Sequence, residues 1–242
     1  MRKIIKPVFL FSIMKKQVIV LSLGGSLIIP DKIDVVFLEK FKKVILRNSK
    51  KYKFVIVCGG GSTARKYISA LKQAGASIYL QGMIGIASTR TNARFMTYFF
   101  GKDANHGIPH DMREIKNMLK FYDIVFCGAL RYAKNETSDA TSAKLANFFK
   151  SPFINMTNVA GLYTKNPLKH KDAKFIPKIT WKEFHRIATK EKFRPGQHFV
   201  IDQTASGIIM KNRIKTYILG KDLSQLENVL ENKKFNGTVI VG

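Results

Sequence analysis

Two apolar strands, each ended by a cluster of glycines and followed by a helix, constrain the fold of this chain more than any other feature. Residues 17–23 (QVIVLSL) and 54–58 are continuous apolar runs of the kind that is covered on both faces in a parallel sheet. The first run ends at Gly24-Gly25-Ser26 and the second at Gly59-Gly60-Gly61. The order strand, glycine turn, helix therefore occurs twice, and it predicts an α/β fold.

The remaining elements alternate along the chain in the same way. Helices are predicted at 34–48, 62–74, 86–100, 112–121, 138–150, 181–188, 202–212 and 223–230, and strands at 123–127, 152–156, 216–219 and 238–241. Ser62 is expected to cap its helix, and 157–174 is expected to be a long polar loop. This alternation indicates a mostly parallel sheet with right-handed crossovers. Because no repeat or linker divides the chain, one domain is expected over 15–242, after an N-terminal extension over 1–14.

The composition excludes several classes of protein. Hydrophobic residues make up 45% of the 242 residues, which excludes wholesale disorder. Cys58 and Cys127 are the two cysteines, and neither belongs to a Cys-x-x-Cys pair. A disulfide framework and a structural zinc site are therefore not expected, and a reducing, cytoplasmic setting fits best.

The net charge of +26 raises the question of a nucleic-acid partner. It results from 42 basic and 16 acidic residues, and 32 of the basic residues are lysines. These lysines are scattered along the chain, and the interleaved basic and aromatic pattern of an RNA-recognition strand is missing. We therefore interpret the charge as a solvated lysine-rich surface and expect no nucleic-acid partner. Anionic small ligands such as nucleotides are favoured by either interpretation.

The N-terminus has a weak likeness to a signal peptide. Its apolar run at 8–13 is shorter than the usual hydrophobic region, Lys15 and Lys16 follow it, and no small-residue cleavage site is present. Met14 directly precedes the first strand, so an extension upstream of the original start is the simpler explanation. No other segment approaches the roughly 20 apolar residues of a membrane span, and no membrane partner is expected.

The two glycine clusters are suited to phosphate binding. Without Cβ atoms their backbone N–H groups can approach a phosphate, and the N-terminus of the following helix adds partial positive charge. Either cluster alone could equally be a tight turn. Two clusters in one sheet, both at carboxyl ends of strands where open α/β sheets bind ligands, favour a nucleotide or phosphoester site.

The two clusters do not match the three known glycine motifs well. Gly59-x-Gly61-x-x-Ala64 matches a loose dinucleotide pattern, but no acidic residue lies between Ala64 and Asp103 to bind a ribose hydroxyl. The Gly-Lys-Ser or Gly-Lys-Thr ending of a Walker A loop is absent, and so is the Gly-x-Ser-x-Gly turn of α/β hydrolases. The dinucleotide interpretation is weak, and the other two are excluded.

Further motifs follow the same order as in one known family. They are Leu23-Gly24-Gly25-Ser26, Gly59-Gly60-Gly61-x-x-Ala64-Arg65-Lys66-Tyr67-Ile68, Ile84-Gly85-Ile86 with Thr89-Arg90-x-Asn92-Ala93, Thr137-Ser138-Asp139-Ala140, Thr157-Asn158-Val159-x-Gly161-x-Tyr163-Thr164, Val200-Ile201-Asp202 and Asn236-Gly237-Thr238. From about residue 17 to the C-terminus, the chain resembles the archaeal-type UMP (uridylate) kinases of the amino acid kinase superfamily. The resemblance implies a three-layer α/β/α sandwich with a mostly parallel central sheet.

The resemblance also implies which residues form the site. ATP would be bound by Ser22, Gly24, Gly25, Ser26, Gly61, Arg65, Thr157, Tyr163 and Asn166, and UMP by Gly60, Gly82, Leu130, Arg131, Thr137 and Ser138. Catalytic roles fall to Arg65 and to Asp139, which would orient active-site groups. Two alternatives stay open: Tyr163 could simply pack in its loop, and Arg65 could be a surface residue of its helix. The implied cofactors are ATP and Mg²⁺, and no side chain is assigned as a metal ligand.

The chain departs from the family pattern at several positions. A lysine that reaches the transferred phosphoryl group is replaced by Gly207, and the acceptor loop around 130–138 is about two residues longer than expected. Because phosphoryl transfer depends on cationic stabilisation, another lysine is expected to supply this charge. Lys134 in the long loop is the first candidate and Lys211 the second. The chain differs from the family at four further positions. Ser22 occupies the place of a lysine of the wider superfamily, and acidic residues of the family are replaced by Gly82, Ala160 and Asn166.

We therefore expect a nucleoside-monophosphate kinase that transfers the γ-phosphoryl group of ATP to UMP, giving UDP and ADP in pyrimidine nucleotide biosynthesis. The alternatives are a nucleotide-binding paralogue with weak or no catalysis and a phosphotransferase of the superfamily with another acceptor. The helix at 86–100 has an aromatic-rich end, and the resemblance implies an oligomer because UMP kinases are typically oligomeric. We therefore expect a homo-oligomer, with a hexamer built from dimers as the expected form.

Overall fold

The computed structural model describes residues 16–132, 136–165, 167, 170–189 and 201–242. Its strands are β1 (Gln17–Leu23), β2 (Tyr52–Cys58), β3 (Ile124–Cys127), β4 (Phe153–Met156), β5 (Leu162–Tyr163), β6 (Phe175–Ile176), β7 (Lys178–Ile179), β8 (Thr216–Leu219) and β9 (Thr238–Ile240). Its helices are α1 (Gly25–Ile28), α2 (Val35–Asn48), α3 (Gly61–Gln73), α4 (Ile78–Phe100), α5 (Met112–Met118), α6 (Ser138–Phe149), α7 (Trp181–Ala188), α8 (Gln203–Lys211) and α9 (Leu223–Leu230), and a 3-10 turn covers Gly101–Asp103.

Seven strands form one mostly parallel sheet in the order β3-β2-β1-β4-β8-β9-β7. Strands β3, β2, β1, β4 and β8 all run in the same direction, and β9 is antiparallel to β8. In this register Leu23 lies beside both Cys58 and Met156. The loops that follow β1, β2, β3, β4 and β8 therefore meet at one edge of the sheet, which we call the carboxyl edge. Strands β5 and β6 form a separate antiparallel pair.

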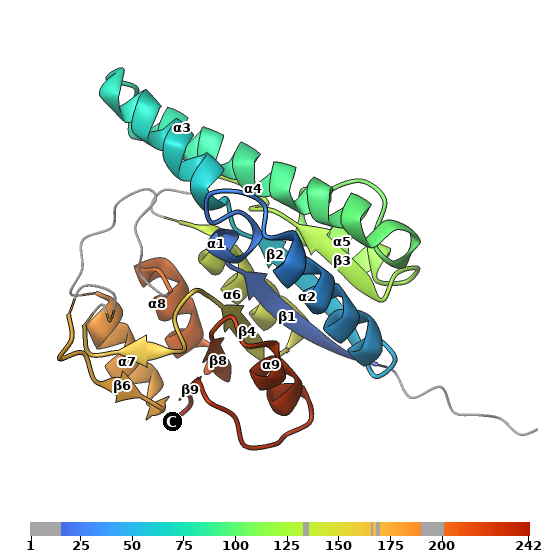
Figure 1. The fold of residues 1–242 in the computed structure, drawn as a ribbon, viewed down its shortest axis with the longest axis vertical. Helices are drawn as coiled ribbons and strands as arrows, with labels where there is room; N and C mark the ends of the chain where they lie inside the picture. The colour runs from blue at the N-terminus through green and yellow to red at the C-terminus, as the bar shows by residue number, and fades with distance from the viewer. Residues whose placement is uncertain (1–15, 133–135, 166, 168–169, 190–200) are drawn as a thin grey trace, which may run out of the picture.

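Helices cover both faces of this sheet (Figure 1). Along β1, Leu21 belongs to a core cluster that includes residues of α2, α4 and α9. Its neighbour Val20 belongs to a second cluster with residues of α5, α6, α7 and α8. Successive residues of a strand point to opposite faces, so the continuous apolar run is buried from both sides. The predicted three-layer α/β/α sandwich with a mostly parallel sheet is confirmed.

Some predicted boundaries were wrong. The helix expected at 86–100 begins eight residues earlier, at Ile78, because the Ser77 hydroxyl accepts a hydrogen bond from the Leu80 N–H at 3.3 Å and caps it. Glycines at 82 and 85 lower helix propensity, but packing of this segment against α3 offsets that cost. Ser62 is not a cap: α3 begins at Gly61, and no side chain caps it.

The phenylalanines at the end of α4 are better covered than expected, whereas Tyr98 is 71% exposed. Phe100 is only 1% exposed, and Phe95 and Phe99 pack against the core. A further exposed apolar surface lies at the start of the helix, where Ile78 is 62% exposed, with other apolar side chains in the same turn. Figure 1 shows this end of α4 projecting with α3 beyond the rest of the molecule. Among the described residues, no helix is both long and apolar enough to cross a membrane.

Candidate nucleotide site

The two glycine loops contact each other backbone to backbone at the carboxyl edge. A Cβ atom added at Gly25 would lie 2.0 Å from the backbone nitrogen of Gly61, and one added at Gly59 would lie 2.4 Å from the nitrogen of Gly25. Gly61 also has a φ of +64°, in the left-handed region that favours glycine. Both the close approach and the turn therefore require glycine. The contact places the N-terminal ends of α1 and α3 next to each other.

The loop after β4 joins this arrangement beside the first glycine loop. The Gly24 N–H donates to the Met156 carbonyl at 3.0 Å, and the Thr157 N–H donates to the Leu219 carbonyl at 2.9 Å. Gly24 and Thr157, both assigned to ATP from the sequence, are thus brought together. Ser26 lies on the same side, partly buried in the short helix α1.

A pair of carboxyl groups lies next to these loops. The Ser22 hydroxyl, at the end of β1, donates to Asp139 at 3.0 Å. Asp139 is in the first turn of α6, which Thr137 caps by accepting a hydrogen bond from the Asp139 N–H at 3.1 Å. The Thr137 hydroxyl in turn donates to Asp202 at 2.5 Å. Asp202 is 2% exposed and caps α8 by accepting from the Ala205 N–H at 2.7 Å. This chain of contacts joins β1, α6 and α8.

The environment of this pair disfavours its negative charge. Burial, followed by repulsion from Asp202, raises the pKa of Asp139 to about 7 from its usual 3.8, although the hydrogen bond from Ser22 opposes the shift. Burial also raises the pKa of Asp202, against the hydrogen bonds from Thr137 and Ala205. Two neighbouring carboxyl groups with raised pKa values are a common mark of a site that receives a cation or a proton.

The residues assigned to the acceptor lie between the second glycine loop, the loop after β3 and α4. A Cβ atom at Gly60 would lie 3.6 Å from that of Ser88 on α4. At Gly82 an added Cβ would be 2.6 Å from the ring of Tyr132, so this tyrosine fills the space next to the glycine. The Tyr132 ring also packs edge-on against Tyr79, with centroids 4.8 Å apart. Tyr132 was not predicted as a site residue, since nothing in its spacing distinguishes it from other loop tyrosines.

Side chains of the motif Thr89-Arg90-x-Asn92 form hydrogen bonds to the loop after β3 and to the second glycine loop. Arg90 donates to the carbonyls of Ala129 and Leu130, the first at 3.1 Å, and Thr89 accepts from the Ala129 N–H at 3.0 Å. The buried Asn92 side chain donates to the Gly59 carbonyl at 2.7 Å. The sequence showed this motif, but the partners of its side chains are distant in the chain and emerged only from the fold.

Three assigned residues make other contacts. The Arg65 guanidinium donates to the Pro30 carbonyl at 3.3 Å, and partial burial lowers its pKa. Arg131 has a side chain that is 80% exposed and lies 4.0 Å from Asp111. The Tyr163 ring packs edge-on against Phe175 at 5.3 Å, which is the packing alternative left open for this residue.

Of the two lysines proposed to replace the missing one, the structure describes only Lys211. Lys134 and Asn166 lie outside the described residues. Lys211 is exposed in the last turn of α8. A Cβ atom at Gly207 would lie 3.5 Å from the His185 ring of α7, so position 207 faces that helix. Ser138 is the first residue of α6.

No group of three or more His, Cys, Asp or Glu side chains with the arrangement of a metal site occurs within the part of the chain that the structure describes. The two carboxyl groups and the neighbouring hydroxyls are oxygen donors, which suit a hard cation such as Mg²⁺. They are too few to hold one without further ligands. They do fit a cation that is also coordinated by phosphate oxygens.

Comparisons with known proteins agree with this geometry. The model of the amino acid kinase family matches residues 17–220. A uridylate kinase of Thermoplasma volcanium is 37% identical over 216 residues, covering 89% of this chain and 93% of that protein. A uridylate kinase of Pyrococcus abyssi is 34% identical over 223 residues, covering 91% and 98%. The crystal structure of a uridylate kinase from Archaeoglobus fulgidus superposes with a TM-score of 0.80 at 33% identity, covering 93% of this chain and all of that one.

Proposed function

The chain belongs to the amino acid kinase family, and we propose that it is a UMP kinase, which transfers the γ-phosphoryl group of ATP to UMP and gives UDP and ADP. The observation that carries the proposal is the contact between the two glycine loops beside the carboxyl pair of Asp139 and Asp202. Such a site can hold phosphate groups from two molecules next to each other. Relatives at 34–37% identity over about nine tenths of the chain carry the name uridylate kinase.

ATP is proposed to bind at the first glycine loop and the loop after β4. Gly24, Gly25 and Thr157 lie together there, and the N-termini of α1 and α3 direct partial positive charge to the same place. Phosphoryl transfer is largely a matter of positioning and charge stabilisation, which this rigid backbone contact supports. Arg65, one turn into α3, is proposed to move from the Pro30 carbonyl to a phosphate when nucleotide binds.

Asp139 is proposed to organise the centre between the two nucleotides. Its pKa of about 7 reflects a negative charge without compensation. Mg²⁺ bound with ATP would supply that compensation and stabilise the charge of the phosphates. Asp139, which accepts a hydrogen bond from Ser22, would then help to orient this Mg²⁺ ion. Asp202 holds Thr137 at the start of α6 by accepting a hydrogen bond from its hydroxyl group.

UMP is proposed to bind on the other side of the second glycine loop, against Gly60, the loop after β3 and the start of α6. Arg90 and Thr89 hold the backbone at residues 129–130, which positions the acceptor loop. Tyr132 fills the space next to Gly82, so its ring is proposed to border the UMP side there. Leu130, Arg131, Thr137 and Ser138 stay proposals for the same side.

We also propose a homo-oligomer whose contacts include the exposed apolar turn at Ile78, with the hexamer as its expected form. We further propose a cytoplasmic location and a role in pyrimidine biosynthesis. The domain is proposed to cover 15–242, after an N-terminal extension over 1–14. Static light scattering tests the assembly, and a monomer mass at micromolar concentration contradicts it.

An acceptor panel tests the activity. ADP release is followed with ATP, Mg²⁺ and, one at a time, UMP, CMP, AMP, GMP, acetate and glutamate. UMP should give the highest kcat/KM, and release should depend on its presence. Faster turnover with another acceptor supports the alternative of a different phosphotransferase. Binding of ATP and UMP without turnover supports the alternative of a nucleotide-binding paralogue.

A further inference from the structure

A cavity lies at the opposite edge of the sheet from the nucleotide site. It has a volume of about 450 Å³ and is lined by the amino ends of β1, β4 and β8 together with the residues that end α6, α8 and α9. In the parallel part of the sheet these strand ends are opposite to the glycine loops. The same helices α6 and α8 carry Asp139 and Asp202 at their other ends. The cavity is therefore separate from the proposed kinase site.

The charged residues that line this cavity are all basic. They are Lys150, Arg213 and Lys215, and no Asp or Glu occurs among the described lining residues. None of the three takes part in a salt bridge within the described structure. Asn147, Asn212 and Asn232 add amide groups that can donate or accept hydrogen bonds. Three cations and three amides without a carboxylate suit a ligand with several anionic oxygens.

The simpler explanation for these cations is compensation of the helix ends. Each helix C-terminus carries about half a negative charge, so α6, α8 and α9 bring about −1.5 to the cavity. The three cations bring +3, so the surroundings stay positive by about 1.5 charges. The three helix ends therefore neutralise only about half of the positive charge of these side chains. The remainder favours a bound anion.

The backbone conformation at these helix ends is a further observation. Within the described structure, three residues other than glycine have positive φ angles: Lys150 at 52°, Arg213 at 51° and Asn232 at 55°. All three line this one cavity. A helix usually ends in this conformation with glycine, and a larger residue costs about 1 kcal/mol or more. The three residues come together because α6, α8 and α9 end at this edge of the sheet, and asparagine is common in this conformation. The unusual feature is that two of the positions, where glycine is usual, carry cationic side chains at the cavity.

We propose that this cavity binds a phosphorylated small molecule through Lys150, Arg213 and Lys215. The arginine can bind a phosphate through two parallel N–H donors, and the lysines act as point charges. The volume of about 450 Å³ accommodates a metabolite that carries one or two phosphate groups, and is too small for a macromolecular segment. Tyr52 and Tyr217 also line the cavity, and the ammonium group of Lys215 lies 5.3 Å from the centroid of the Tyr217 ring.

The protein carries its own reporter for this cavity. Trp181 is its one tryptophan, and the indole N–H donates to the carbonyl of Ile214 at 3.0 Å. Ile214 lines the cavity between Arg213 and Lys215. A ligand that rearranges this segment should change the fluorescence of Trp181. Isothermal calorimetry on the same samples detects binding that leaves the fluorescence unchanged.

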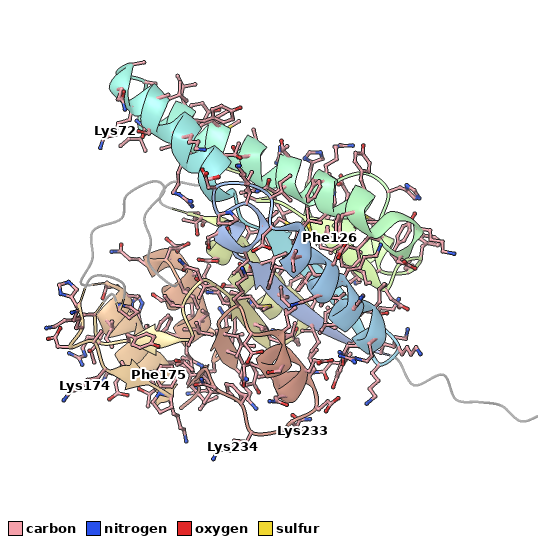
Figure 2. The ribbon with its side chains drawn as sticks, in the orientation of Figure 1. Lys72, Phe126, Lys174, Phe175, Lys233 and Lys234 are labelled. Atoms are coloured by element: carbon pink, nitrogen blue, oxygen red, sulfur yellow. The ribbon has the colours of Figure 1, made fainter. Side chains whose placement is uncertain are left out.

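The test is a titration with inorganic pyrophosphate at 150 mM ionic strength, which screens weak surface attraction. UMP and a non-hydrolysable ATP analogue are present at saturating concentrations, so that the kinase site is occupied. Lys150→Gln/Arg213→Gln removes two charges from the cavity. Lys72→Gln/Lys174→Gln removes two exposed charges elsewhere; Figure 2 shows Lys72 near the tip of α3 and Lys174 beside Phe175. Neither control residue lines the cavity.

We expect saturable binding in the wild type and in the control variant, and binding at least tenfold weaker in the cavity variant. Lys150→Gly/Arg213→Gly should show the same loss, and because glycine relieves the positive φ angles, it guards against a variant that fails to fold. Equal affinity in the cavity and control variants would mean attraction to the overall charge of +26 and overturn the proposal. Absence of saturable binding to the wild type by both methods would also overturn it.

Discussion

Replacing Asp139 by asparagine should stabilise the protein and lower its kcat at the same time. Asparagine has nearly the same shape and keeps an oxygen that accepts the hydrogen bond from Ser22. It removes a charge that burial and Asp202 disfavour. Functional residues often hold such unfavourable arrangements at the expense of stability.

The size of the effect follows from the pKa. Asp139 has a pKa of about 7 in the folded protein, compared with a usual value of 3.8. At about 1.4 kcal/mol for each pH unit, the charged form destabilises the fold by up to about 4 kcal/mol. Below pH 3.8 the carboxyl group is protonated in both the folded and the unfolded states, so it costs nothing. Between pH 3.8 and 7 the unfolded state loses its proton first, and stability declines as pH rises. Above pH 7 the cost is constant.

Urea unfolding at pH 4.5, 6 and 8 measures this dependence. Asp139→Asn should exceed the wild type in free energy of unfolding at pH 8, and the difference should shrink as the pH falls to 4.5. Its kcat should fall about 10²-fold, the usual effect of removing one electrostatic group from an active site. Asp222→Asn is the control with the opposite sign, because hydrogen bonds from Gln225 and Ser224 lower the pKa of Asp222. A destabilised Asp139→Asn at pH 8, or a difference independent of pH, would refute the reasoning.

Three further changes test separate parts of the structure. Gly25→Ala should weaken ATP binding and destabilise the fold by about 1–3 kcal/mol, because its Cβ would overlap the second glycine loop at 2.0 Å. Gly85→Ala meets its nearest neighbour at 3.5 Å and removes a glycine from the interior of α4, so it should leave ATP binding nearly unchanged and raise stability by up to about 1 kcal/mol; calorimetry and thermal unfolding measure both effects. Lys150→Gly should raise the free energy of unfolding by about 1 kcal/mol, since glycine adopts a φ of 52° without strain; unchanged or lower stability in urea contradicts this. Gly207→Lys should change kcat less than threefold, because the position faces His185 on α7, and a large gain in turnover would show that the missing lysine limits catalysis.

The sequence predicted the parts of the fold that local patterns determine. The apolar run of β1 was identified with its correct ends, and so was the helix α9, because both are bounded by clear turn and cap residues. The start of α4 was missed, since its glycines look like a break until the packing of α3 against it is known. The two-residue strand β5 was likewise too short to produce a pattern.

The candidate site shows a similar limit. The glycine loops follow from their places after two buried strands, and Asp139 from the resemblance to the family; the structure brings the two loops together. Asp202 was part of a quoted motif, but its link to Thr137 spans 65 positions and depends on how α6 and α8 pack. Tyr132 has no motif at all and was found only because it fills the space beside Gly82. The roles of Asp202 and Tyr132 depend on contacts between segments that are distant in the chain, and such contacts cannot be predicted from the periodicity of the sequence.

A single-turnover experiment tests the central claim most directly. ATP labelled at the γ-phosphorus is mixed with excess protein, Mg²⁺ and UMP, quenched at successive times, and the products are separated. If the glycine loops hold both nucleotides side by side as proposed, the label should move from ATP to the β-position of UDP, with one ADP formed for each UDP. Label that stays in ATP while both nucleotides are bound, or that appears as inorganic phosphate without UDP, would contradict the assignment of this site as a UMP kinase.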